Sequence, residues 1–139
     1  MDYSVVNMGI EDYAEVIALW RSTEGLGLSK ADSEEGISRF LIHNPGLSYV
    51  ARRKGGLVGA VLCGCDGRRG YIHHLAVEKG SRRLGIGKAL VSNCLKTLNE
   101  QGIQKCHIFV FTDNQLAIDF WNAATWKQRF ELILMSKDT

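Results

Sequence analysis

A glycine-rich turn between a strand-like segment and a long helical repeat constrains this chain more than any other feature. Residues 70–77 end in Leu-Ala-Val, and beyond the turn the apolar residues recur every four positions. These are Ile86, Leu90, Cys94 and Leu98. Their spacing predicts an amphipathic helix over residues 85–101, opened by Gly85-Ile86-Gly87-Lys88 and ended by Gly102. A strand that leads directly into such a helix is typical of folds in which helices cover a sheet.

The remaining apolar patterns predict the order β-α-α-β-β-β-α-β-α-β, a mixed α/β sheet with helices packed on it. The expected strands cover residues 3–6, 47–52, 57–65, 70–77, 106–111 and 130–135. The expected helices follow residue 10, begin near residue 32, span residues 85–101 and follow Asn114. Short joints at residues 54–56 and 66–69 make the middle strands antiparallel neighbours. The loop over residues 21–32 is long enough to form a substrate lid.

The composition indicates one compact domain over residues 1–139, with 45% apolar and 23% charged residues. No uncharged stretch approaches the roughly 20 apolar residues of a membrane-spanning helix, and the N-terminus lacks the apolar region of a secretory signal. We therefore expect a cytoplasmic protein without membrane partners. The net charge of +2 gives little support for binding nucleic acid. The spacing of Cys63, Cys65, Cys94 and Cys106 favours packed, reduced thiols and no metal site.

The glycine turn is well suited to bind an anion. The N–H groups of a helix's first turn point outward at the positive end of its dipole, and glycine lets a phosphate approach the main chain closely. The alternative is a turn whose glycines serve packing alone. Two familiar phosphate loops do not fit. A Walker A loop requires glycine at Arg82 and Ser or Thr at Ala89, and the dinucleotide fingerprint requires glycine at Leu90.

The pattern Arg82-x-x-Gly-x-Gly87, directly after a strand ending in Leu-Ala-Val, resembles the acetyl-CoA motif of the GCN5-related N-acetyltransferase (GNAT) superfamily. Asn114-x-x-Ala-x-x-Phe-Trp121 resembles a second segment of that family, and the order of elements agrees over nearly the whole chain. The resemblance implies a GNAT-like fold in which strands 4 and 5 splay apart. It also implies an N-acetyltransferase that moves an acetyl group from acetyl-CoA to a primary amine, on a small molecule or a protein. The amine attacks directly in a ternary complex, and no metal is needed.

The resemblance further implies which residues bind acetyl-CoA. The main chain at the end of the fourth strand pairs with the pantetheine arm, and the turn binds the pyrophosphate. Asn114 bonds the cofactor arm, caps the following helix, or does both. The implied residues are Leu75, Ala76, Val77, Arg82, Arg83, Leu84, Gly85, Ile86, Gly87, Lys88 and Asn114.

Candidates for the chemistry lie on the fourth strand. Strict alternation places Tyr71 and His73 on one face and His74 on the other. Some family members carry a histidine two residues before the strand's leucine, the position of His73, and an imidazole is suited to deprotonating an amine near neutral pH. The alternative is a core or cross-strand histidine. Glu78 is a weaker candidate base.

The acid that protonates the leaving thiolate is less evident. Many relatives carry a tyrosine where Trp121 stands, and an indole cannot act as an acid. Tyr71 or solvent takes that role in our interpretation, and Trp121 packs. Because that tyrosine is missing, a non-catalytic acyl-CoA sensor of the same fold is the alternative function. Thr125-Trp126 also replaces the Gly-Phe common in relatives, and a homodimer is an open alternative to a monomer.

Overall fold

The computed structural model describes residues 2–139, which divide into two compact units, residues 2–109 and 110–139. The first unit is built on a five-stranded mixed sheet in the order β1-β2-β3-β4-β5. Its strands are β1 (Ser4–Asn7), β2 (Tyr49–Arg53), β3 (Gly56–Cys65), β4 (Gly70–Val77) and β5 (Cys106–Ile108). All neighbours are antiparallel except β4 and β5, which run parallel.

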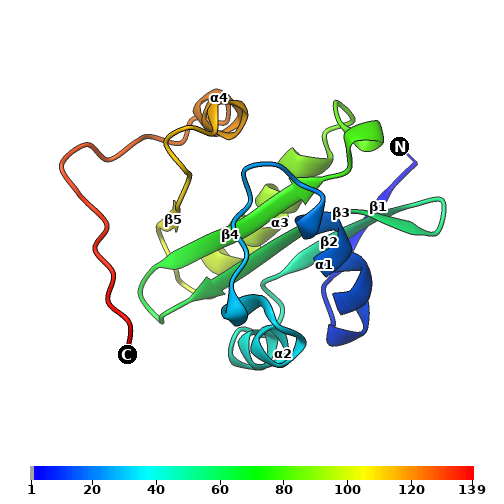
Figure 1. The fold of residues 1–139 in the computed structure, drawn as a ribbon, viewed down its shortest axis with the longest axis horizontal. Helices are drawn as coiled ribbons and strands as arrows, with labels where there is room; N and C mark the ends of the chain where they lie inside the picture. The colour runs from blue at the N-terminus through cyan, green and yellow to red at the C-terminus, as the bar shows by residue number, and fades with distance from the viewer. Residues whose placement is uncertain (1) are drawn as a thin grey trace. The chain divides into compact units, whose positions relative to one another are not determined.

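Three helices of this unit cover the sheet, as Figure 1 shows. They are α1 (Tyr13–Arg21), α2 (Glu34–His43) and α3 (Ile86–Glu100), joined by the short 3-10 helices η1 (Ile10–Asp12), η2 (Lys30–Asp32) and η3 (Lys79–Ser81). α1 and α2 lie on one face and α3 lies on the other. No described helix combines the length and apolarity needed to cross a membrane.

Each face of the sheet has its own apolar contacts. Trp20, Ile37 and Leu62 are buried together on the side of α1 and α2. On the other side α3 packs so closely that a Cβ atom at Gly59 would lie 3.0 Å from a methyl carbon of Ile86. Burial of each large apolar side chain contributes about 1.5–3 kcal/mol, so these layers hold the sheet between its helices.

The last two strands of the sheet pair only briefly. Gly70, Tyr71 and Ile72 pair with Cys106, His107 and Ile108. β5 ends at Ile108, whereas the sequence predicts a strand to residue 111. Among the described residues, positions 73–77 of β4 have no partner strand on that side. This open edge is the separation of strands 4 and 5 that the family resemblance implies.

A β-bulge at His74 changes the faces of β4. His73 pairs with Leu62 and Ala76 pairs with Ala60, so His74 and the following residue together oppose Val61. His74 accordingly adopts a left-handed backbone with φ 53°. A bulge adds one residue and breaks the alternation of side chains. The prediction that the two histidines take opposite faces is wrong, because both line the same pocket on the side of α1 and α2.

The second unit contains α4 (Gln115–Ala123), and Oδ1 of its N-cap residue Asn114 accepts a hydrogen bond from the backbone N–H of Ala117 at 3.1 Å. Trp121 is buried and packs edge-on against Phe120 and Trp126. The packing role expected for Trp121 is thereby confirmed.

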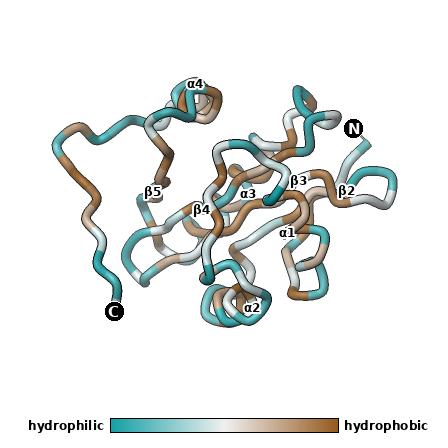
Figure 2. The backbone as a smooth tube through the Cα atoms, in the orientation of Figure 1, coloured by the Kyte–Doolittle hydropathy of each residue, from teal (hydrophilic) through white to brown (hydrophobic). Residues whose placement is uncertain are grey.

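The strand predicted over residues 130–135 is wrong. Residues 130 and 131 form a turn, residues 132–135 have no strand pairing, and the large apolar side chains from Phe130 to Met135 are exposed. Figure 2 shows this segment as an apolar stretch of tube. An apolar run favours a strand only if a neighbouring strand supplies hydrogen bonds, and local sequence cannot reveal that partner.

Thr125 offers a test of the turn that ends α4. It adopts φ 69°, a left-handed conformation that is unfavourable for a β-branched residue. We expect Thr125→Gly to raise the free energy of unfolding by about 1 kcal/mol, because relief of backbone strain outweighs glycine's greater entropy loss. Urea denaturation measures the change. An unaltered or lower stability would show that the threonine is not strained.

Candidate active site

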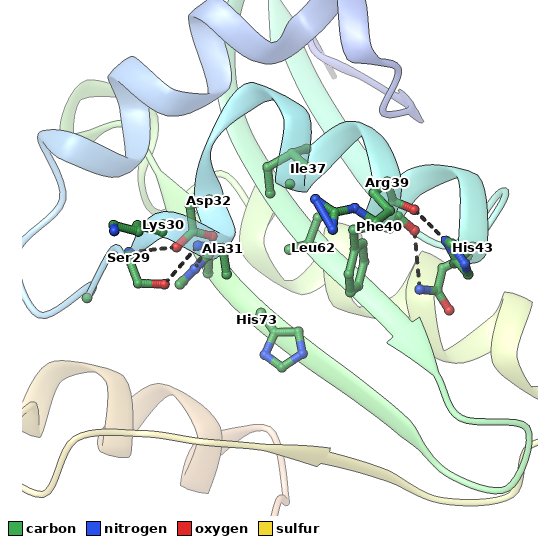
Figure 3. Close-up of a pocket in the computed structure, with 14 residues that line it drawn as sticks. Ser29, Lys30, Ala31, Asp32, Ile37, Arg39, Phe40, His43, Leu62 and His73 are labelled. Atoms are coloured by element: carbon green, nitrogen blue, oxygen red, sulfur yellow. Dashed lines mark hydrogen bonds and ion pairs between the residues drawn. The ribbon is translucent and has the colours of Figure 1, made fainter. Parts of the chain in front are cut away.

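An open pocket of about 630 Å³ lies between α2, η2 and the bulged part of β4, within the first unit. Figure 3 shows His73 facing it from the strand and Phe40 facing it from the helix. Its lining residues are Gly27, Ser29, Lys30, Ala31, Asp32, Gly36, Ile37, Arg39, Phe40, His43, Asn44, Leu62, His73 and His74. The loop predicted to act as a lid therefore supplies part of the wall. Residues 46–49, which precede and open β2, do not line it.

His73 combines partial burial with free ring nitrogens. Its ring lies 6.2 Å from that of Phe40 and 6.3 Å from that of Phe109, measured between centroids. Among residues 2–139 it has no hydrogen-bond partner. Burial lowers the pKa of His73 first, the neighbouring His74 lowers it further, and Asp32 partly opposes both. The imidazole is therefore neutral near pH 7 and can accept a proton.

His74 is held in a different way. Its Nε2 lies 2.9 Å from Oδ1 of Asp32, and its ring centroid lies 4.9 Å from that of Trp20. The other carboxylate oxygen of Asp32 accepts a hydrogen bond from the N–H of Ser29 at 3.0 Å. The side chain of Asp32 is only 7% exposed, so both of its oxygens are committed within the protein.

Sequence reasoning did not identify Asp32 as a site residue. Ser29-x-x-Asp32 has the spacing of a capping box, and the structure forms one around η2. That pattern could have indicated an aspartate turned toward its own backbone. Its pairing with His74, 42 residues away, has no local signal.

The other two catalytic candidates lie outside the pocket lining. Tyr71 sits on β4 two residues before His73, with its ring stacked on Phe109 at 6.3 Å. Glu78 is exposed beyond the end of β4, and its N–H donates to the carbonyl of Val58. The structure thus brings Tyr71 near the site and leaves Glu78 in solvent at the strand's end.

The glycine turn follows β4 and the short η3 helix, and it is exposed from Arg82 to Gly85. Two left-handed residues, Arg83 with φ 66° and Gly85 with φ 82°, turn the chain into α3. The first helical hydrogen bond runs from Ala89 to Gly85, so the N–H groups of residues 86–88 precede the helical ladder. Successive N–H groups in such a turn form a concave site for anions.

Arg82 joins the turn to the strand. Its Nε donates a hydrogen bond to the carbonyl of Val77 at 3.1 Å. Residues 75–77, the implied partners of the pantetheine arm, lie on the part of β4 that β5 leaves open. From His73 to Val77 this edge extends about 13 Å. The turn predicted to bind an anion and the histidine-lined pocket therefore lie along one strand.

Comparisons with known proteins identify the family of the chain. Residues 13–124 match the Acetyltransferase (GNAT) family. A curated acetyltransferase from Sodalis glossinidius is 34% identical over 91% of this chain and 89% of its own length. Another, from Pectobacterium atrosepticum, is 38% identical over 80% of this chain and 78% of its own.

Solved structures share the fold at low sequence identity. The PaiA N-acetyltransferase of Thermoplasma acidophilum, in complex with coenzyme A, superposes with a TM-score of 0.79 at 18% identity, over 89% of each chain. An aminoglycoside acetyltransferase from a soil metagenome, in complex with sisomicin, gives 0.75 at 18% identity, over 99% of this chain and 97% of that one. From the family match and the curated relatives together, the chain belongs to the GNAT family of acetyltransferases.

Proposed function

We propose that this acetyltransferase moves the acetyl group of acetyl-CoA to a primary amine bound in the pocket beside His73. The observation that carries the proposal is His73 itself, a neutral imidazole without a hydrogen-bond partner among the described residues, facing that pocket. The solved structure of PaiA in complex with coenzyme A supports acetyl-CoA as the cosubstrate.

Acetyl-CoA would lie along the open edge of β4. The N–H groups of residues 83–88 would bind its pyrophosphate, with positive charge from Arg82 and Lys88. The main chain of Leu75, Ala76 and Val77 would pair with the pantetheine arm. Asn114 stays a prediction for a contact with that arm, beside its observed capping of α4.

The transfer requires a neutral amine and a proton for the leaving group. His73 takes a proton from the ammonium, directly or through water, and the amine nitrogen attacks the thioester carbonyl. The C–N bond forms, the nitrogen releases its second proton to solvent as the amide forms, and the C–S bond breaks. Tyr71 or solvent protonates the thiolate, which leaves as coenzyme A, and Tyr71 would regain its proton from solvent. His73 returns its proton to solvent before the next cycle.

Calorimetric titration with acetyl-CoA, with ATP and NAD as controls, tests the cofactor. An assay of thiol release with amines tests the transfer. We expect binding of acetyl-CoA alone and amine-dependent release of thiol. Binding without transfer to any amine would favour the sensor, and a folded protein that does not bind acetyl-CoA would refute the proposal.

The pH dependence should report His73. Because its pKa lies below the ordinary value of about 6.5, the base is already neutral at pH 7, and kcat/KM falls only when the pH drops below that value. His74→Gln removes the electrostatic effect by which His74 lowers the pKa of His73, so the pKa of His73 should rise. We expect the acid limb of the pH profile to move to higher pH in this variant. An unmoved limb would assign it to another group.

A further inference from the structure

The pocket carries an unusual balance of charge for an enzyme that binds amines. Three of its residues, Lys30, Arg39 and His43, are basic and exposed at its rim, and Asp32 is its only carboxylate. Figure 3 shows Lys30 on η2 and Arg39 on α2, so the cationic groups come from separate elements. The acidic residues of α2, Glu34 and Glu35, are exposed and do not line the pocket.

The single carboxylate is not available to a substrate. Its two oxygens bond His74 and the N–H of Ser29, and its side chain is almost fully buried. An amine with several positive charges needs carboxylates to replace its water, and this pocket offers none that is uncommitted.

The cationic groups, in contrast, are available. Neither Lys30 nor Arg39 forms an ion pair with any residue of the described chain. His43 bonds only the backbone carbonyl of Arg39 through Nδ1, at 2.9 Å. A guanidinium and an ammonium at the mouth of a pocket bind carboxylate or phosphate groups.

The space between rim and strand is apolar. Ile37, Phe40 and Leu62 form part of the wall near His73. The volume of about 630 Å³ lies within the range of small-molecule sites. We propose that the acceptor is a small amine with an apolar body and an anionic group, a carboxylate or a phosphate, which Arg39 and Lys30 bind while the amine faces His73. This inference rests on the proposed function and adds its substrate class.

Matched amines test the inference. We would compare phenylalanine with phenylalaninamide, and O-phosphoethanolamine with ethanolamine. The quantity compared is kcat/KM calculated on the concentration of the neutral amine. Spermidine and kanamycin serve as polycations. We expect the anionic member of at least one pair to react about tenfold faster, and the polycations to react more slowly than it. The pair with the larger ratio distinguishes carboxylate from phosphate.

Substitutions at the rim of the pocket test whether Arg39 and Lys30 cause the preference for anionic amines. Arg39→Gln and Lys30→Gln should each reduce the ratio within the preferred pair, whereas Lys96→Gln, exposed on α3 across the sheet, should leave it unchanged. The inference would be overturned if spermidine or kanamycin reacted faster than the anionic amines, or if no anionic amine reacted. It would also be overturned if the ratio of kcat/KM within each pair were near one, or if Arg39→Gln and Lys30→Gln left that ratio unchanged. The neutral and polycationic amines separate these outcomes from failure of the proposed function. Transfer to them without a preference for anionic amines overturns only the inference, whereas loss of acetyl-CoA binding or absence of transfer to every amine would refute the proposed function.

Discussion

A Gly87→Glu variant loses binding of acetyl-CoA by at least about 100-fold, because like-charge contact costs several kcal/mol. Gly87 is the second residue of α3, in the first turn that follows the left-handed Gly85. A carboxylate there would stand among the N–H groups expected to bind the pyrophosphate and would repel it. Calorimetric titration of both proteins measures the change in Kd.

The control places the same charge elsewhere on α3. Asn99→Glu adds one carboxylate at an exposed position near the far end of the helix, about 18 Å along its axis. We expect this variant to bind acetyl-CoA like the natural chain. Equal binding by the Gly87→Glu variant would show that the turn serves packing alone and would remove the cofactor site from this end of α3.

His73→Ala lowers kcat by about 10²–10⁴-fold, the contribution typical of a positioned general base. The variant loses the only pocket imidazole that has no hydrogen-bond partner within residues 2–139, whereas His74 remains bonded to Asp32. The affinity for acetyl-CoA should persist, since His73 lies four residues before Val77 and away from the glycine turn. Steady-state kinetics and calorimetry on the same preparation separate these two quantities.

A second histidine provides the matched control. His107 lies on β5 outside the pocket lining, and His107→Ala should keep a kcat near that of the natural chain. If His73→Ala also kept its kcat, His73 would be a packing residue against Phe40 and Phe109. A water or another group would then accept the proton.

Much of the fold could be predicted because it rests on local patterns. The period of α3, the tight joints of the middle strands and the cap at Asn114 each involve residues close in sequence. The prediction of a strand over residues 130–135 was wrong because a strand also depends on residues that are distant in the sequence. Its apolar composition was read correctly, but a strand depends on a hydrogen-bonding neighbour that composition does not specify.

The candidate site likewise contains residues that the local sequence identifies and residues that only the packing of distant segments brings together. The glycine turn and His73 could be identified from residues within one strand-turn-helix segment. Arg39 and Phe40 could be placed on a helix, but nothing in their spacing indicated that this helix borders His73. The packing of α2 and η2 against β4 brings these distant segments to one pocket.

By itself, the amino-acid sequence determined the succession of elements as far as α4 and the family, because each depends on local periodicity or a short motif. It also predicts an anion site at the glycine turn. Only the tertiary structure decided which way the two histidines face. The bulge at His74 reverses the alternation of β4, and the pairing of His74 with Asp32 joins positions 42 residues apart. Alternation in a strand holds only while its register holds, and the register is set by the neighbouring strand.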